Sequence, residues 1–154
     1  MMVRQAMPAD AAAMSRVLID SITLLCERDH GGVQGHLDSW LANKSPAGIM
    51  AWFNNPENRL LVADRGGDIV GVGGFNERGI VLLNYVAPEA RFSGVSTALL
   101  AAVESGVQAM GHAEASLTST VTAHDFYLAR GWRDEGDPTP RFGVLVHPMT
   151  KSFA

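Results

Sequence analysis

The chain contains very little cysteine, few charged residues and no long apolar run. Cys26 is the only cysteine among 154 residues, which excludes both a disulfide within the chain and a cysteine-based zinc site. Such sparing use of cysteine is typical of a reducing compartment, so we predict a cytoplasmic protein. Charged residues make up 18% of the sequence and the formal net charge is -4. Nucleic acid is therefore not expected as a partner, because surfaces that bind it are normally basic.

The lack of a long apolar run argues against a membrane-spanning helix and against a signal peptide. No uncharged apolar segment reaches the ~18 residues that a membrane-spanning helix requires, so no membrane partner is expected. Arg4 and Asp10 precede any apolar stretch, so no signal peptide is predicted. Apolar residues nevertheless make up 47% of the sequence. A chain of this length can bury roughly 68–70% of its unfolded surface, and we expect one globular domain over residues 1–154.

Hydrophobic periodicity predicts an alternation of helices and strands. Apolar residues recur at spacings of three and four over residues 10–25 and 94–110, as on one face of an amphipathic helix. The remaining expected elements are short helices at 36–43, 47–54 and 124–130, strands at 3–7, 60–64, 69–75, 80–86, 113–118, from 132 and at 143–149, and loops at 27–32 and 137–140.

The resulting order, β-α-α-β-β-β-α-β-α-β-β, predicts an α/β fold. Antiparallel strands followed by a β-α-β crossover favour a mixed, mostly antiparallel central sheet with helices on both faces. The strand at 80–86 is almost entirely apolar, so we expect it to be central and covered on both faces. Asp10 is expected to cap the first long helix.

The turn between the strand at 80–86 and the helix that follows could bind an anion. The start of a helix offers unpaired N–H groups and about half a positive charge. Gly94 would allow a ligand close to the backbone, Ser93 and Ser96 carry small hydroxyl groups, and Arg91 adds a cation. The pattern is compatible with a pyrophosphate cradle, although most strand–helix turns with one glycine bind nothing.

The same residues resemble a known family. The string Arg91-x-x-Gly94-x-Ser96 is similar to the (Gln/Arg)-x-x-Gly-x-(Gly/Ala) signature of the GCN5-related N-acetyltransferases, which follows a bulged central strand. A second segment, Phe126-Tyr127-x-x-x-Gly131-Trp132, resembles that family's (Leu/Phe)-Tyr-x-x-x-Gly-(Phe/Trp) segment. The order of the two motifs and the element string extend this resemblance over the whole chain.

The resemblance implies acetyl-CoA as co-substrate, with no metal ion. Backbone groups of Val86 and Ala87 would hold the pantetheine arm like an added strand. Tyr127 would be the acid that protonates the leaving coenzyme A thiolate. The pyrophosphate would be held by the amides of Arg91, Phe92, Ser93, Gly94, Val95 and Ser96.

Three positions depart from the family pattern. Phe92 stands where glycine is most common, which would narrow the cradle or change contacts at its rim. Ser96 replaces the final glycine or alanine, a small change. Thr120 stands where many relatives carry asparagine near the pantetheine. These departures concern individual contacts and leave the cradle itself in place.

A general base is harder to assign. Many relatives use a glutamate on the central strand, but residues 80–86 contain no carboxylate. The segment from Cys26 to Trp52 offers His30 as the first candidate. The other candidates are Glu27, Asp29 and His36.

The sequence thus predicts transfer of an acetyl group from acetyl-CoA to a primary amine of a small molecule, by direct attack in a ternary complex. The alternative is a sensor of the same fold that binds an acyl-CoA or a small ligand with little turnover. A toxin-like enzyme acting on charged transfer RNA is disfavoured by the acidic balance and by only two lysines. A homodimer is compatible with the sequence.

Overall fold

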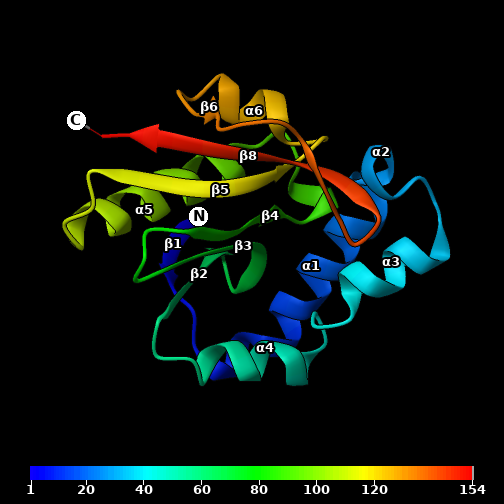
Figure 1. Cartoon of the computed structure of the whole chain (residues 1–154). Helices are drawn as coiled ribbons and strands as arrows, with labels where there is room; N and C mark the ends of the chain where they lie inside the picture. The colour runs from blue at the N-terminus through cyan, green and yellow to red at the C-terminus, as the bar shows by residue number, and fades with distance from the viewer. Residues whose placement is uncertain (154) are drawn as a thin grey trace.

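The computed structural model describes residues 1–153, in which strands and helices alternate (Figure 1). The strands are β1 (Met2–Gln5), β2 (Asn58–Arg65), β3 (Asp68–Asn76), β4 (Val81–Val86), β5 (Glu114–Thr120), β6 (Arg133–Asp134), β7 (Thr139–Arg141) and β8 (Val144–Ser152). The α-helices are α1 (Ala11–Leu25), α2 (Glu27–His30), α3 (Gln34–Leu41), α4 (Pro46–Phe53), α5 (Val95–Ala109) and α6 (His124–Leu128). Two 3₁₀ turns are η1 (Pro8–Asp10) and η2 (Pro88–Ala90).

The strands form two antiparallel sheets. The first has the order β1-β2-β3-β4, and the second has the order β5-β8-β6, with β7 also paired to β8. A parallel bridge between Ile80 and Ser116 links the two sheets. Figure 1 shows β5 and β8 lying together with α6 and β6 above them, whereas α1, α3 and α4 group on the other side of β4. The predicted α/β fold, with a mostly antiparallel sheet and helices on both faces, is confirmed.

The central strand β3 is covered on both faces by the two long helices. Every residue of β3 after Asp68 is buried, and both α1 and α5 pack against the strand. Glycine makes the close approach of α5 possible: a Cβ at Gly71 would lie 2.6 Å from a Val95 methyl and 2.7 Å from a Leu99 methyl. α5 is therefore seated directly on the sheet, and its first turn lies beside the end of β4.

Three local expectations are corrected by the structure, and a fourth holds in part. Residues 27–30 form the helical turn α2 instead of a loop, and β7 occupies part of the expected 137–140 loop. Pro140 is tolerated in β7 because that strand pairs only with β8. The strand expected to be central and covered on both faces is β4, which is the last strand of the first sheet. Its Leu82 is 40% exposed, so β4 is not covered on both faces. Asp10 is the N-cap residue of α1, as expected, but its side chain makes no capping bond, because its carboxylate accepts from Arg4 and from the Met7 amide.

In the part of the chain that the structure describes, no helix combines the length and the apolar character that crossing a membrane requires.

Candidate active site

A cavity opens where the two sheets separate. The Ser116 amide donates to the Gly79 carbonyl at 3.1 Å beside the Ile80–Ser116 bridge, and beyond this point β4 and β5 diverge. The space between them has a volume of about 550 Å³. Its walls are β4, the first turn of α5, the second half of β5 and the helix α6. Both motifs recognised in the sequence thus border one cavity.

A bulge in β4 shapes the wall of this cavity. Gly74 pairs with Leu83 and Phe75 with Val81, so Leu82 has no partner on β3. After the bulge, residues 84–86 are partly buried and line the cavity. Because β4 is not paired with β5 here, its outer backbone groups are available to an extended ligand.

Of the two residues expected to hold the pantetheine arm, Val86 lines the cavity and Ala87 does not. The Ala87 amide donates to the Val70 carbonyl at 2.8 Å and so belongs to the β3–β4 pairing. The Val86 backbone is the better placed of the two for a ligand.

The loop before α5 leaves amides unpaired at the cavity. Gly94 precedes the helix with a φ of +85°, and no side chain caps the first turn. A Cβ built on Gly94 would meet nothing within 4 Å, so the space in front of the helix is open. Among the expected cradle residues, Arg91, Phe92, Gly94, Val95 and Ser96 line the cavity. The structure brings these residues together around the open start of α5, a kind of place where anions often bind in proteins.

Ser93 is the exception in this loop. It does not line the cavity, and its hydroxyl donates to the Ala90 carbonyl and accepts from Arg65 Nη2 at 2.9 Å. Ser93 therefore holds the loop in shape and attaches it to the β2–β3 hairpin.

Phe92 shows why a glycine would suit its position. Its φ is +62°, in the left-handed region that costs a non-glycine residue about 1–2 kcal/mol. The side chain is 92% exposed, and its ring lies 4.6 Å from the Arg91 guanidinium carbon. The ring projects into solvent, so it does not narrow the cradle and instead extends the rim.

Two further arginines lie near the start of α5. Arg130 lines the cavity, where its Nη2 donates to Thr97 Oγ1 at 3.0 Å and its guanidinium stacks 3.7 Å above the Phe126 ring. Arg65 reaches the same loop through Ser93. Three arginines from separate segments thus surround the first turn of α5 and favour an anionic ligand. Arg130 lies inside the second motif, but nothing in the sequence indicated Arg65.

Tyr127 also lines the cavity, on α6. The residue is buried, and its ring makes edge contacts with Phe126 at 5.2 Å and Trp132 at 6.0 Å. Burial raises the pKa of the phenol to about 12, and a hydrogen bond from Asn84 acts in the opposite direction. The hydroxyl therefore keeps its proton throughout the physiological pH range.

Asn84 is a polar cavity residue with unused capacity. Its Oδ1 atom is buried and has no hydrogen-bond partner among the described residues. An unpaired buried acceptor costs about 1–3 kcal/mol, which a ligand N–H group could recover. In the sequence, this position was notable only because the strand at 80–86 has no carboxylate, and nothing there predicted an unpaired acceptor.

The α1 side of the cavity carries no conventional base. Burial raises the pKa of the Cys26 thiol to about 12, so it is neutral at pH 7. Burial also raises the pKa of Tyr85, whose hydroxyl interacts with Trp40. Among the lining residues that the structure describes there is no aspartate, glutamate, histidine or lysine.

His30 lies outside the lining of the cavity. Its ring is buried, Nδ1 accepts from the Gly32 amide at 2.9 Å, and Nε2 lies 3.1 Å from the Thr23 carbonyl. Since a carbonyl only accepts, Nε2 carries the proton and both nitrogens are engaged by the backbone. His30 holds the turn after α2, and its role as a general base stays a prediction.

Asp29 also has a structural role. Its carboxylate accepts from the Val121 amide at 2.6 Å and the Thr122 amide at 3.3 Å. Thr120, Thr122 and the following alanine line the cavity, so Asp29 fixes the loop that forms this part of the wall. The other two candidate bases, Glu27 and His36, do not line the cavity.

Replacing His30 by alanine is expected to lower the free energy of unfolding by about 2–4 kcal/mol, because two backbone groups lose their partner and a cavity is left. The KM for acetyl-CoA should not change. Urea unfolding measures the first effect and steady-state kinetics the second. A stable variant that loses an acidic limb in its pH–rate profile would instead support His30 as a base.

Comparison with known proteins identifies the family. Residues 25–153 match the model of the acetyltransferase (GNAT) domain. The chain belongs to the GNAT acetyltransferase family. No curated protein sequence matches it significantly.

Solved structures of GNAT proteins share the fold. A GCN5-related N-acetyltransferase from Rhodopseudomonas palustris matches with a TM-score of 0.86 and 25% identity, over 98% of this chain and 94% of that one. The PaiA N-acetyltransferase from Thermoplasma acidophilum, in complex with coenzyme A, matches with a TM-score of 0.79 and 18% identity, over 98% of both chains. The aminoglycoside 6'-N-acetyltransferase from Enterococcus faecium has a TM-score of 0.73 and 14% identity, over 100% of this chain and 98% of that one. The resemblance drawn from the two motifs is confirmed.

Proposed function

We propose that this GNAT protein transfers an acetyl group from acetyl-CoA to a primary amine of a small molecule, by direct attack within a ternary complex. The observation that carries the proposal is the single cavity that joins the uncapped first turn of α5 to the buried phenol of Tyr127. The amides and arginines suit an anionic cofactor, and the phenol suits a leaving group that needs a proton.

The residues present fit coenzyme A. The pyrophosphate would lie on the amides from Gly94 to Ser96, with Arg91 and Arg130 beside it, and the arm would run along β4 at Val86. The Thermoplasma acidophilum relative binds coenzyme A within the same fold, which supports this assignment. When bound, acetyl-CoA supplies an activated acyl group as a thioester.

Tyr127 would donate its proton as the carbon–sulfur bond breaks. Outright transfer from a phenol of pKa about 12 to a free thiolate of pKa about 8.5 is uphill by roughly 5 kcal/mol. The proton must therefore move while the sulfur is still forming its charge and is more basic than a free thiolate. Burial of Tyr127 holds the hydroxyl in place and keeps water from competing.

The described cavity lining contains no aspartate, glutamate, histidine or lysine that could act as a general base, and this limits the acceptor. An alkylamine of pKa about 10.4 is neutral in fewer than one molecule per thousand at pH 7, a cost near 4.6 kcal/mol. An α-amino group of pKa about 7.7–8.0 costs only about 1–1.4 kcal/mol. We therefore favour a weakly basic amine, such as the α-amino group of an amino-acid-like molecule. Asn84 Oδ1 is free to accept a hydrogen bond from it.

A polycationic acceptor fits less well. The Enterococcus faecium relative is an aminoglycoside acetyltransferase, but the described lining of this cavity offers no carboxylate to a multiply charged amine.

The alternative function is an acyl-CoA sensor, which the missing base favours and the buried Tyr127 opposes. One domain over residues 1–154 and a cytoplasmic location remain part of the proposal.

The two functions are separated by release of the coenzyme A thiol. Purified protein is incubated with acetyl-CoA and with amines that range from amino acids to polyamines and aminoglycosides, and free thiol is followed. We expect saturable turnover with small, weakly basic amines and little with polyamines. Binding of acetyl-CoA without amine-dependent thiol release would favour the sensor.

The pH dependence should follow the acceptor and not the enzyme. The kcat/KM for the amine should rise with pH up to the pKa of that amine and then level off, because only the neutral amine attacks. For two acceptors of similar size but different pKa, the pH at which kcat/KM levels off should differ by the difference between their pKa values. A limb that stays at one pH for both acceptors would show that an enzyme group acts as the base.

A further inference from the structure

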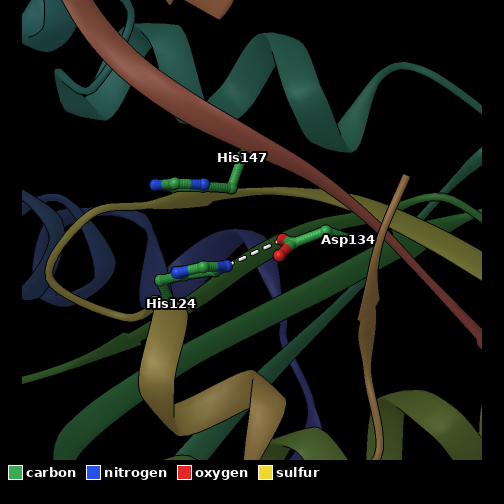
Figure 2. Close-up of side chains that lie close together, drawn as sticks. All are labelled: His124, Asp134 and His147. Atoms are coloured by element: carbon green, nitrogen blue, oxygen red, sulfur yellow. Dashed lines mark hydrogen bonds and ion pairs between the residues drawn. The ribbon is translucent and has the colours of Figure 1, made fainter. Parts of the chain in front are cut away.

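Three side chains meet on the second sheet, away from the cavity. Figure 2 shows His124, Asp134 and His147 together, and they come from α6, β6 and β8. Their ligand atoms all lie within 4.8 Å of one another. None of the three lines the proposed acetyl-transfer cavity. The cluster is therefore a separate feature of the molecule.

The contacts in this cluster are specific. His124 Nε2 lies 2.7 Å from Asp134 Oδ1. The imidazole rings of His124 and His147 are stacked, with centroids 3.8 Å apart and planes 9° from parallel. Within residues 1–153, the ring nitrogens of His147 make no hydrogen bond. Two imidazoles and a carboxylate thus lie together, and the ring nitrogens of His147 are not engaged in hydrogen bonds within the described residues.

The geometry points to a binding site for one divalent transition-metal ion, with His124, Asp134 and His147 as protein ligands. Imidazole nitrogen and carboxylate oxygen are suitable ligands for Zn²⁺, Co²⁺ and Ni²⁺, whereas Mg²⁺ and Ca²⁺ prefer oxygen alone. Three protein ligands with water in the remaining position form a known coordination pattern for zinc.

The side chains must rotate to close the site, because the parallel rings of His124 and His147 do not aim their nitrogens at one point. Metal–ligand bonds of about 2.0–2.1 Å at tetrahedral angles place ligand atoms about 3.4 Å apart. The His124–Asp134 pair is now at 2.7 Å, and no pair is wider than 4.8 Å. The side chains of His124 and Asp134 are 20% and 47% exposed, so an ion can reach them from solvent and the side chains have room to rotate. Because a carboxylate only accepts, His124 Nε2 now holds a proton that metal binding at this atom would release.

The bound ion would join α6 to the second sheet. His124 is the first residue of α6, and Tyr127 lies one turn further along the same helix. Asp134 and His147 lie on two strands that both belong to the sheet of β5. An ion that binds only the folded arrangement stabilises it, so thermal stability is a readout independent of acetyl transfer.

The test uses the full chain without an affinity tag, after chelator treatment and dialysis. Zn²⁺ is titrated calorimetrically, and Co²⁺ binding is followed by visible absorption. We expect one ion per chain, and roughly tenfold or greater loss of affinity in His147→Ala and in Asp134→Asn. His112→Ala is the matched control, because His112 is a partly exposed histidine outside the cluster whose ring bonds to the Glu77 carbonyl. Its affinity should equal that of the wild type, and Mg²⁺ should not bind.

The melting temperature gives a second readout. Zn²⁺ should raise it in the wild type and in His112→Ala, but not in the two cluster variants. Melting in the presence of a chelator shows whether all variants are equally folded without metal. Equal Zn²⁺ affinity in the wild type and His147→Ala, or no saturable binding by the wild type, would overturn the proposal.

Discussion

Replacing Tyr127 by phenylalanine is expected to lower kcat by roughly 10²–10⁴, the range that general-acid catalysis contributes. The substitution keeps the ring and its edge contacts with Phe126 and Trp132. It removes only the proton that the leaving thiolate needs. The KM for acetyl-CoA should change little, because the substitution removes no amide or arginine of the pyrophosphate cradle.

The matched control is Tyr85→Phe, which removes the hydroxyl of the second tyrosine that lines the same cavity. Its effect on kcat should be at least an order of magnitude smaller than that of Tyr127→Phe. Single-turnover measurements are preferred, because slow product release could mask a change in the chemical step. Equal rates for Tyr127→Phe and the wild type in a single turnover would restrict Tyr127 to packing.

Replacing Gly94 by glutamate is expected to weaken coenzyme A binding by at least tenfold, which corresponds to about 1.4 kcal/mol. The side chain would enter open space in front of the uncapped first turn of α5. It would carry a negative charge to the place where the pyrophosphate is expected. Isothermal titration calorimetry with coenzyme A measures the effect.

Gly94→Gln separates charge from bulk and strain. At a φ of +85° any side chain is strained, and both variants share that cost. The glutamate variant should therefore bind more weakly than the glutamine variant, and the difference should shrink at high salt. Unchanged coenzyme A affinity in both variants would remove this loop from the cofactor site.

The elements that build the cavity could be predicted from local patterns. The apolar period between Gly94 and Met110 depends on residues near one another in sequence, and α5 forms there. The separation of β4 from β5 could not be predicted in this way. The pattern of a strand shows how apolar its faces are, but not how far a neighbouring strand continues to pair with it.

The roles of the α2 residues depend on backbone partners that their side chains reach only in the folded chain. Asp29 accepts from amides of Val121 and Thr122, more than ninety residues away. His30 is held by the Thr23 carbonyl and the Gly32 amide. In sequence these residues are charged and polar groups beside glycines, a pattern that offers candidate bases but does not show these contacts. The approach of Arg65 to the cradle is likewise a tertiary contact without a local signal.

The central claim is that this cavity performs acetyl transfer, and isotope transfer tests it most directly. Acetyl-CoA labelled with ¹³C at the carbonyl is mixed with the protein and the best amine from the panel, and the products are followed by NMR and mass spectrometry. We expect the label to appear as an amide of the acceptor, in step with free coenzyme A and without an acetylated protein intermediate. Saturable binding of labelled acetyl-CoA with no amide formed from any amine would contradict the claim and leave the sensor as the function.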